Sequence, residues 1–197
     1  MSETHAAIDA VWRIESARVI ARLARLVGDV GLAEDLAQDA LVAALEQWPK
    51  EGVPRNPGAW LMTAAKHRAL DQLRRRKMLE RRHTQLGHEL EERQEAGVAE
   101  LEQAIDDPIG DDLLRLMFAT CHPVLSQEAR VALTLRLLGG LTTPEIARAF
   151  LVPEPTVAQR IVRAKRTLTE AKVPIELPPP AELERQGRLH ALITQNV

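Results

Sequence analysis

Residues 141–168, with the sequence LTTPEIARAFLVPEPTVAQRIVRAKRTL, contain the pattern of two short helices joined by a tight turn. Thr142 and Glu145 have the spacing of a capping box, and Pro144 suits the first turn of a helix. The Leu151–Pro153 segment then turns the chain into a second helix, expected from about Pro155 to Ala171. Two such helices, the second basic on its outer face, are typical of a helix-turn-helix.

The outer face of the second helix carries the predicted DNA contacts. Its apolar positions Val157, Ile161 and Leu168 share one side, so the polar residues of the first turns face a major groove. Gln can pair with adenine and Arg with guanine, whereas basic side chains farther along the helix are expected to contact phosphates. The predicted contacts are Thr156, Gln159, Arg160 and Arg163 for bases, and Lys165 and Arg166 for phosphates. An ordinary helical hairpin with solvated arginines is the alternative.

The composition favours an all-α fold. The chain has 197 residues, of which 45% are hydrophobic and only 3% aromatic. Ala, Leu, Glu and Arg dominate, and all four favour helices. The length allows two small domains. We expect a first domain over 1–83, a flexible acidic linker over 84–110, a helix-turn-helix domain over 111–173 and a Pro-rich tail over 174–197 that ends in a short helix at about 181–193.

The first domain is predicted to contain three helices, at about 8–27, 32–48 and 57–76. A loop rich in Pro and Gly precedes the third helix, which is the most basic. In the second domain, Ser126 is a good N-cap for a helix that reaches Leu138 and is terminated by Gly139-Gly140.

Charge is segregated along the chain. The net charge is −2, with a pI near 6.3, which looks wrong for a DNA-binding protein. Basic residues nevertheless gather at 66–82 and 160–172, and acidic residues at 89–112. For binding a polyanion, the distribution of charge along the chain matters more than the net charge. Two basic segments therefore indicate two surfaces for a polyanion.

Two blocks of sequence together resemble a known family. Residues 33–39 (AEDLAQD) and 60–75 (WLMTAAKHRALDQLRR) are similar to conserved region 2 of the extracytoplasmic-function (ECF) RNA polymerase sigma factors. Residues 141–147 and 155–165 are similar to region 4. The resemblance implies a transcription initiation factor that binds core RNA polymerase and recognises the −10 and −35 promoter elements. It implies no cofactor and no enzyme activity.

The resemblance also implies roles for particular residues. The second helix would bind the clamp of the polymerase β′ subunit, while region 4 would meet the β flap and read the −35 element. The implied polymerase contacts are Asp35, Gln38 and Asp39. The implied −10 contacts are Trp60, His67, Arg68, Asp71, Arg74 and Arg75. His67 departs from the Asn that the family often has there.

Cys121-His122 lacks the four ligands of a structural zinc site, so no metal is expected. Cys121-His122-Pro123 resembles a sigma subgroup with a C-terminal domain of helical repeats, which implies regulation by that extension or by an anti-sigma factor. The single cysteine, the lack of a signal-peptide pattern and the lack of an apolar span predict a cytoplasmic protein.

Two other functions are compatible with parts of the sequence. A stand-alone helix-turn-helix regulator would explain the second domain but leaves the blocks at 33–39 and 60–75 unexplained. An enzyme is disfavoured because the chain has no Gly-rich phosphate loop, Ser-His-Asp arrangement or metal cluster in its sequence.

Overall fold

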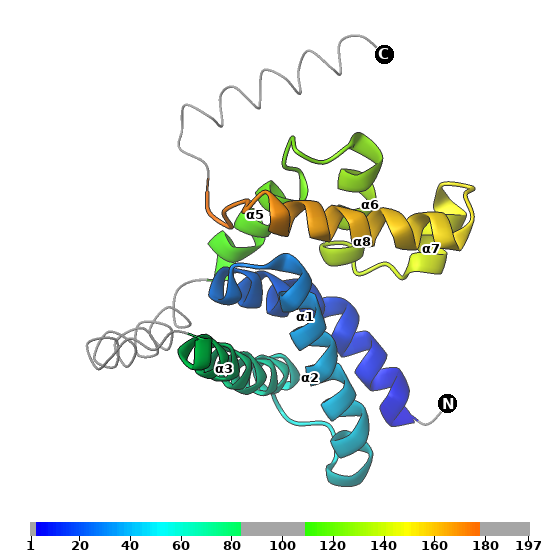
Figure 1. The fold of residues 1–197 in the computed structure, drawn as a ribbon. Coiled ribbons are helices and arrows are strands. Elements are labelled where there is room, and N and C mark those ends of the chain that lie inside the picture. The colour runs from blue at the N-terminus through cyan, green and yellow to red at the C-terminus, as the bar shows by residue number, and fades with distance from the viewer. Residues whose placement is uncertain (1–2, 84–108, 178–197) are drawn as a thin grey trace.

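The computed structural model describes residues 3–83 and 109–177, and in that part of the chain every regular element is a helix (Figure 1). The all-α prediction is therefore confirmed. The helices are α1 (Glu3–Val27), α2 (Val30–Glu51), α3 (Pro57–His83), α5 (Ile109–Thr120), α6 (Gln127–Leu137), α7 (Thr143–Ala149) and α8 (Glu154–Glu170).

Local signals explain where the helices of the first domain begin and end. Gly28 ends α1 with a φ of 69°, a left-handed conformation that favours glycine. Asp29 caps α2, because its Oδ1 accepts a hydrogen bond of 2.8 Å from the Leu32 N–H. Asn56 does the same for α3, accepting from the Ala59 N–H at 3.1 Å. The third helix extends to His83, beyond the expected end near Arg76.

Both caps predicted in the second domain are present. The Ser126 hydroxyl accepts from the Ala129 N–H at 3.3 Å. The capping box of α7 is complete, since the Thr142 N–H donates to Glu145 at 2.8 Å and the Glu145 N–H donates to the Thr142 hydroxyl at 3.4 Å. The helix-turn-helix therefore consists of α7, a turn at 150–153 and α8.

The two domains pack against each other along α1. This helix contacts α2 and α3 of its own domain and also α5 of the second, while α8 lies beside the start of α2 (Figure 1). The buried side chains form one continuous cluster, from Ile8 and Leu36 in the first domain to Leu133 and Leu168 in the second. The sequence did not predict this shared core.

Some predictions fall on residues outside the described part. The acidic linker lies almost wholly at 84–108, and the short C-terminal helix was expected at about 181–193. The proposed domain boundaries therefore stay predictions. Among the helices that are described, none has a stretch long and apolar enough to cross a membrane.

Candidate nucleic-acid interface

The outer face of α8 is open to solvent. Gln159, Arg163 and Arg166 are exposed, and Thr156 is half-buried near the start of the helix. The opposite face packs into the core through Val157, Ile161, Ala164 and Leu168, as the periodicity predicted. Near the end of the helix, Arg166 Nε donates to the Glu170 carboxylate at 2.7 Å. Gln159 and Arg163 are thus the predicted base readers with the freest approach to DNA.

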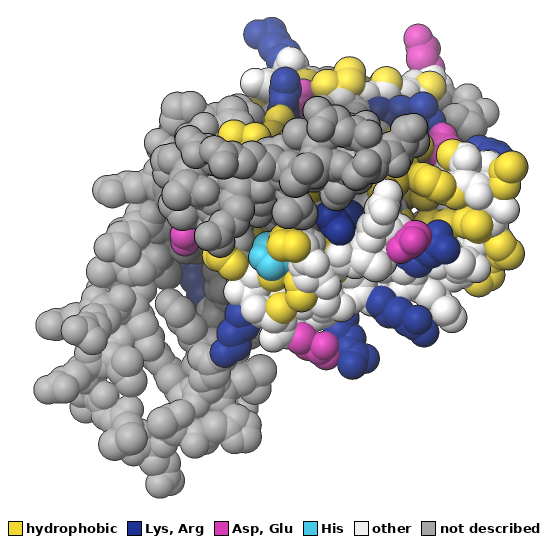
Figure 2. Space-filling model, turned by 90° about the horizontal axis from the view of Figure 1, so that it is seen from above, with side chains coloured by type: hydrophobic (Ala, Val, Ile, Leu, Met, Phe, Trp, Pro, Cys, Tyr) yellow, Lys and Arg dark blue, Asp and Glu magenta, His cyan; other side chains and the backbone are white. Residues whose placement is uncertain are grey.

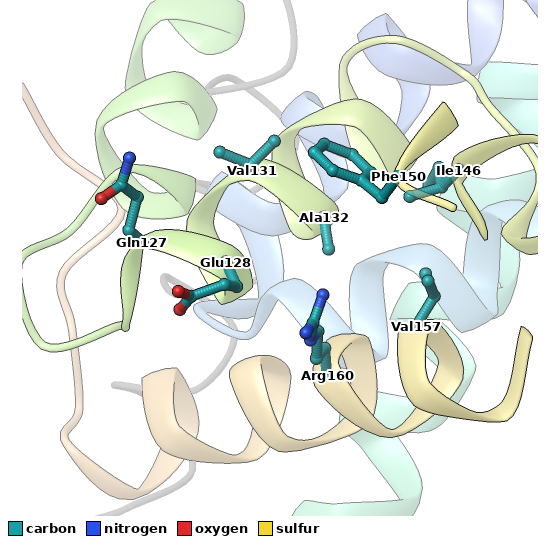
Figure 3. A pocket seen from close by; sticks show the side chains of 8 residues that line it. All are labelled: Gln127, Glu128, Val131, Ala132, Ile146, Phe150, Val157 and Arg160. Atoms are coloured by element: carbon teal, nitrogen blue, oxygen red, sulfur yellow. The ribbon is translucent and has the colours of Figure 1, made fainter. Parts of the chain in front are cut away.

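Arg160 lies differently from its neighbours. Its side chain is half-buried and points from α8 toward α6, into a groove of about 230 Å³ (Figure 3). The groove is lined by Gln127, Glu128, Val131, Ala132, Ile146, Phe150, Val157 and Arg160. The pKa of Glu128 lies below its ordinary value because its own backbone N–H and the Ser126 hydroxyl donate to the carboxylate, with a smaller effect of Arg160. Arg160 is therefore partly committed to its own domain.

Lys165, the predicted phosphate contact, faces the first domain. Its ammonium group pairs with the carboxylate of Glu34 on α2, and the Lys165 side chain keeps 21% of its exposure. In this arrangement of the two domains, Lys165 neutralises a protein carboxylate.

The predicted −10 contacts lie along α3. His67, Asp71, Arg74 and Arg75 are exposed, while Trp60 and Arg68 are half-buried. Arg74 and Asp71 are 4.0 Å apart, and both side chains keep more than 60% of their exposure. Exposed pairs of this kind contribute little to stability, so these charges remain available to a ligand.

Trp60 is packed against the core on one side and partly open to solvent on the other. Its ring packs edge-on against the buried ring of Trp48, with centroids 5.3 Å apart and planes at 72°. Part of the ring nevertheless stays exposed at the start of α3. Trp48 thus holds Trp60 in place, and the open part of the ring could stack on an unpaired base.

The predicted polymerase contacts on α2 are not equivalent. Asp35 and Asp39 are exposed one helical turn apart. Gln38 is half-buried and donates from Nε2 to the Glu34 carboxylate at 3.0 Å. The open acidic surface therefore consists of the two aspartates, and Gln38 supports a neighbour.

Cys121 and His122 belong to the turn between α5 and α6. His122 Nδ1 accepts from the Val124 N–H at 3.2 Å, and Cys121 Sγ lies 3.8 Å from the Thr134 hydroxyl. Within residues 3–83 and 109–177 there is no group of three or more His, Cys, Asp or Glu side chains that could hold a metal ion. The geometry gives these two residues a structural role in the turn.

Sequence reasoning missed three charged residues that join the domains. Glu34, Asp112 and Arg136 carry ion pairs whose partners lie up to 131 residues away in the chain, as between Glu34 and Lys165. Glu34 is 3% and Asp112 3% exposed. The only available signal was Glu34 itself, an acid beside the apolar side of a predicted helix.

The visible surface of the second domain mixes charge types. Figure 2 looks down on this domain and shows Lys and Arg side chains next to hydrophobic and uncharged ones, with few acidic groups among those in view. A helix-turn-helix with an exposed polar face, beside a domain whose longest helix is basic, defines a two-domain DNA-binding protein.

Comparison with known families gives a narrower assignment. Residues 13–78 match the family Sigma-70 region 2, and residues 115–168 match Sigma-70, region 4. The matched segments contain α2, most of α3 and all but the last two residues of the helix-turn-helix. The chain belongs to the sigma-70 family, among its ECF sigma factors.

Curated relatives agree with this assignment. The ECF RNA polymerase sigma factor SigL of Mycobacterium tuberculosis is 31% identical over 156 residues, which are 78% of this chain and 82% of SigL. The probable ECF sigma factor SigI of the same species is 27% identical over 89% of this chain and 59% of SigI. An uncharacterized protein of Rhizobium meliloti is 38% identical over 87% of this chain, but the chain spans only 40% of that protein's length.

Proposed function

We propose that the chain is a transcription initiation factor that binds core RNA polymerase and directs it to promoters with a −10 and a −35 element. The observation that supports this most is the presence of three separate open surfaces in one sigma-70 chain. They are the outer face of α8, the exposed side of α3 and the acidic pair on α2.

The outer face of α8 would read the −35 element. A recognition helix meets base edges near its N-terminus, where Gln159 and Arg163 are exposed. Each side chain can make a bidentate contact, Gln with adenine and Arg with guanine. Arg166 is placed later, where a helix leaves the groove and meets phosphates.

The exposed side of α3 would recognise the −10 element. His67, Arg74 and Arg75 supply hydrogen-bond donors, and the two arginines attract a phosphate backbone. The half-buried Trp60 offers a ring on which an unpaired base can stack. Such a combination suits DNA whose strands are separated.

Asp35 and Asp39 would contact the polymerase, and the β′ clamp is the proposed partner. Two carboxylates with little role in folding are suited to a basic surface on another protein. A stand-alone regulator would have no use for this pair or for α3, and the sigma-70 region 2 match disfavours that alternative.

The test is a titration of core RNA polymerase with the chain, followed by run-off transcription from a promoter library. Asp35→Lys with Asp39→Lys should weaken binding by at least tenfold, because both charges are reversed at the proposed contact. Asp9→Lys with Glu51→Lys makes the same charge change at exposed acids elsewhere and should bind as the wild type does. Equal affinity of all three proteins would contradict the proposed contact. A wild-type chain that neither binds the polymerase nor supports transcription would contradict the proposed function.

A further inference from the structure

An exposed valine lies among the polar residues on the outer face of α8. Val162 is 64% exposed, although the adjacent Ile161 is 6% exposed and belongs to the core. At about 100° per residue, Gln159 lies near the middle of the outer face, with Val162 on one side of it and Arg163 on the other. The two proposed base readers therefore share their surface with one branched apolar side chain.

A second apolar residue lies beside this valine. Ala158 is exposed and lies one helical turn before Val162, so the two side chains are neighbours on the helix surface. Neither of them can donate or accept a hydrogen bond. Lys165 borders the pair, but its ammonium group is bound to Glu34. Ala158 and Val162 thus form a short apolar strip that is open to solvent.

Folding alone does not account for a valine at this position. A single exposed apolar residue is ordinary on a protein surface, so exposure by itself carries little meaning. A β-branched residue is, however, a weaker helix former than Ala, Lys, Arg or Glu, which make up much of α8. At 64% exposure, Val162 also contributes little buried area to the core. What sets Val162 apart is its place beside Gln159 and Arg163.

The major groove offers one apolar group to such a side chain. Of the four bases, only thymine presents a methyl group there, at C5, and apolar side chains contact it. The base 5-methylcytosine carries the same group at the same ring position. Residues three or four apart on a helix are about 5–6 Å apart, and base pairs are stacked about 3.4 Å apart. Val162 can therefore reach a base pair next to those that Gln159 and Arg163 contact.

We propose that Val162, with Ala158 beside it, contacts the C5 methyl group of a pyrimidine in the −35 element and makes thymine preferred at one position there. The inference rests on the proposed function and adds a base contact that the polar side chains of α8 do not supply. Because 5-methylcytosine presents the same methyl group, methylation of a cytosine at that position should strengthen binding.

The expected effect is small and specific to one atom group of the DNA. Burial of one methyl group strengthens binding about fourfold. Loss of a bidentate contact, such as the one proposed for Arg163, weakens binding by about 5- to 150-fold. The methyl contact must therefore be tested by changing the methyl group alone.

The first test removes the methyl group from the DNA. Holoenzyme assembled from core RNA polymerase and the full chain first selects a −35 element from a library. Each thymine of either strand in that element is then replaced, one at a time, by deoxyuridine, which keeps the base pair and lacks only the methyl group. The ratio of affinities for the thymine and uracil forms is measured for each protein. A ratio taken on one protein cancels any general loss of affinity in a variant.

We expect the wild type to bind the uracil form about fourfold more weakly at one position. Val162→Ala should bind both forms equally there, because the shorter side chain does not reach the methyl group. Val124→Ala is the matched control, since it shortens a valine that is 43% exposed in the turn between α5 and α6, and it should keep the fourfold ratio.

Three results would overturn the methyl contact. They are equal wild-type affinity for thymine and uracil at every position, a ratio that Val162→Ala leaves unchanged, and a selected −35 element without any A·T pair.

The second test adds the methyl group to a different base. At the position found in the first test, the T·A pair is replaced by a C·G pair with cytosine or with 5-methylcytosine. The wild type should bind the methylated form about fourfold more tightly, and Val162→Ala should bind both forms equally. Equal binding of the two forms by the wild type would show that the methyl group is not what Val162 recognises.

The two proposals fail in different ways. If the wild-type chain neither binds core polymerase nor supports transcription, the proposed function fails. The comparison of thymine with uracil is then made on duplexes that the chain alone selects from a random-sequence pool, and it still tests the methyl contact.

Discussion

The two helices proposed to meet DNA differ in how their cations are placed. On α3, Arg74 and Arg75 are exposed, and the contact between Arg74 and Asp71 is a weak one at 4.0 Å. On α8, Lys165 is paired with Glu34, Arg166 with Glu170, and Arg160 points toward α6 (Figure 3). The basic charge of α3 is open to a ligand, whereas on α8 Lys165 is neutralised within the protein and Arg160 points toward α6, which leaves Arg163 and Arg166 exposed.

This difference explains why a basic segment in a sequence is a weak guide to a basic surface. Both segments predicted a polyanion site, and both have several cations within a few turns. Only the fold decides which cations find acids, because partners such as Glu34 come from the other domain. A lone acid on a distant helix can thus change what a cluster of cations can bind.

The largest expected effect is on α3. Arg74→Ala with Arg75→Ala should reduce promoter opening by the holoenzyme by about a hundredfold, because two charge-assisted contacts of about 1.5 kcal/mol each are lost. Permanganate footprints of the melted bubble measure this. Circular dichroism should stay the same, since both side chains are exposed. Footprints as strong as those of the wild type would show that Arg74 and Arg75 are only solvated. The proposed difference between α3 and α8 in their contacts with DNA would then not hold.

A smaller effect separates two arginines on α8. Arg163→Ala should cost about 1–3 kcal/mol and relax preference at one base of the −35 element. Arg160→Ala should change base preference less, because its side chain lies in the groove beside Glu128. Affinities for a set of single-base changes in the −35 element measure both. A stronger change of preference for Arg160→Ala than for Arg163→Ala would show that Arg160 leaves the groove on DNA.

Arg166→Ala provides the matched comparison. Arg166 is exposed and lies three residues beyond Arg163. The substitution should weaken binding to all −35 sequences alike and lower the slope of log K against log salt by about one unit, as expected for the loss of a phosphate contact. A change of base preference in Arg166→Ala would show that Arg166 contacts a base and not a phosphate.

The smallest expected effect concerns the stability contributed by the capping box at the start of α7. The pKa of Glu145 lies below its ordinary value of 4.5 because the Thr142 N–H, and then the Thr142 hydroxyl, donate to its carboxylate. A lowered pKa in the folded state adds stability that is present above about pH 4.5 and is lost as pH falls through the folded value. The thermal stability of the wild type should therefore fall more in acid than that of Glu145→Gln, as thermal unfolding at a series of pH values would measure. Parallel pH profiles for the two proteins would contradict this.

Local features of the fold were predictable from the sequence. The caps at Ser126 and Thr142 and the apolar positions of α8 depend on residues within a few places of each other. The outward position of Gln159 and Arg163 follows from the same periodicity. In each case neighbouring residues alone determine the outcome.

What escaped prediction depends on contacts between distant residues. Lys165 and Arg163 are two places apart on one helix and so face different sides of it, but only the packing of α2 beside α8 places a carboxylate next to Lys165. Arg160 likewise needs the position of α6 before its direction is known. Roles of α2, α3 and α8 toward polymerase and promoter remain predictions for the experiments above.

The edge-on pair of Trp48 and Trp60 has a spectroscopic consequence. The chain has three tryptophans and no tyrosine, and all three tryptophans, including Trp12, lie in the first domain. Its intrinsic fluorescence is therefore a signal from that domain alone. Trp60 is part-exposed at the start of α3, and a base stacked on it would quench its emission, so binding of single-stranded −10 DNA could be followed without a label.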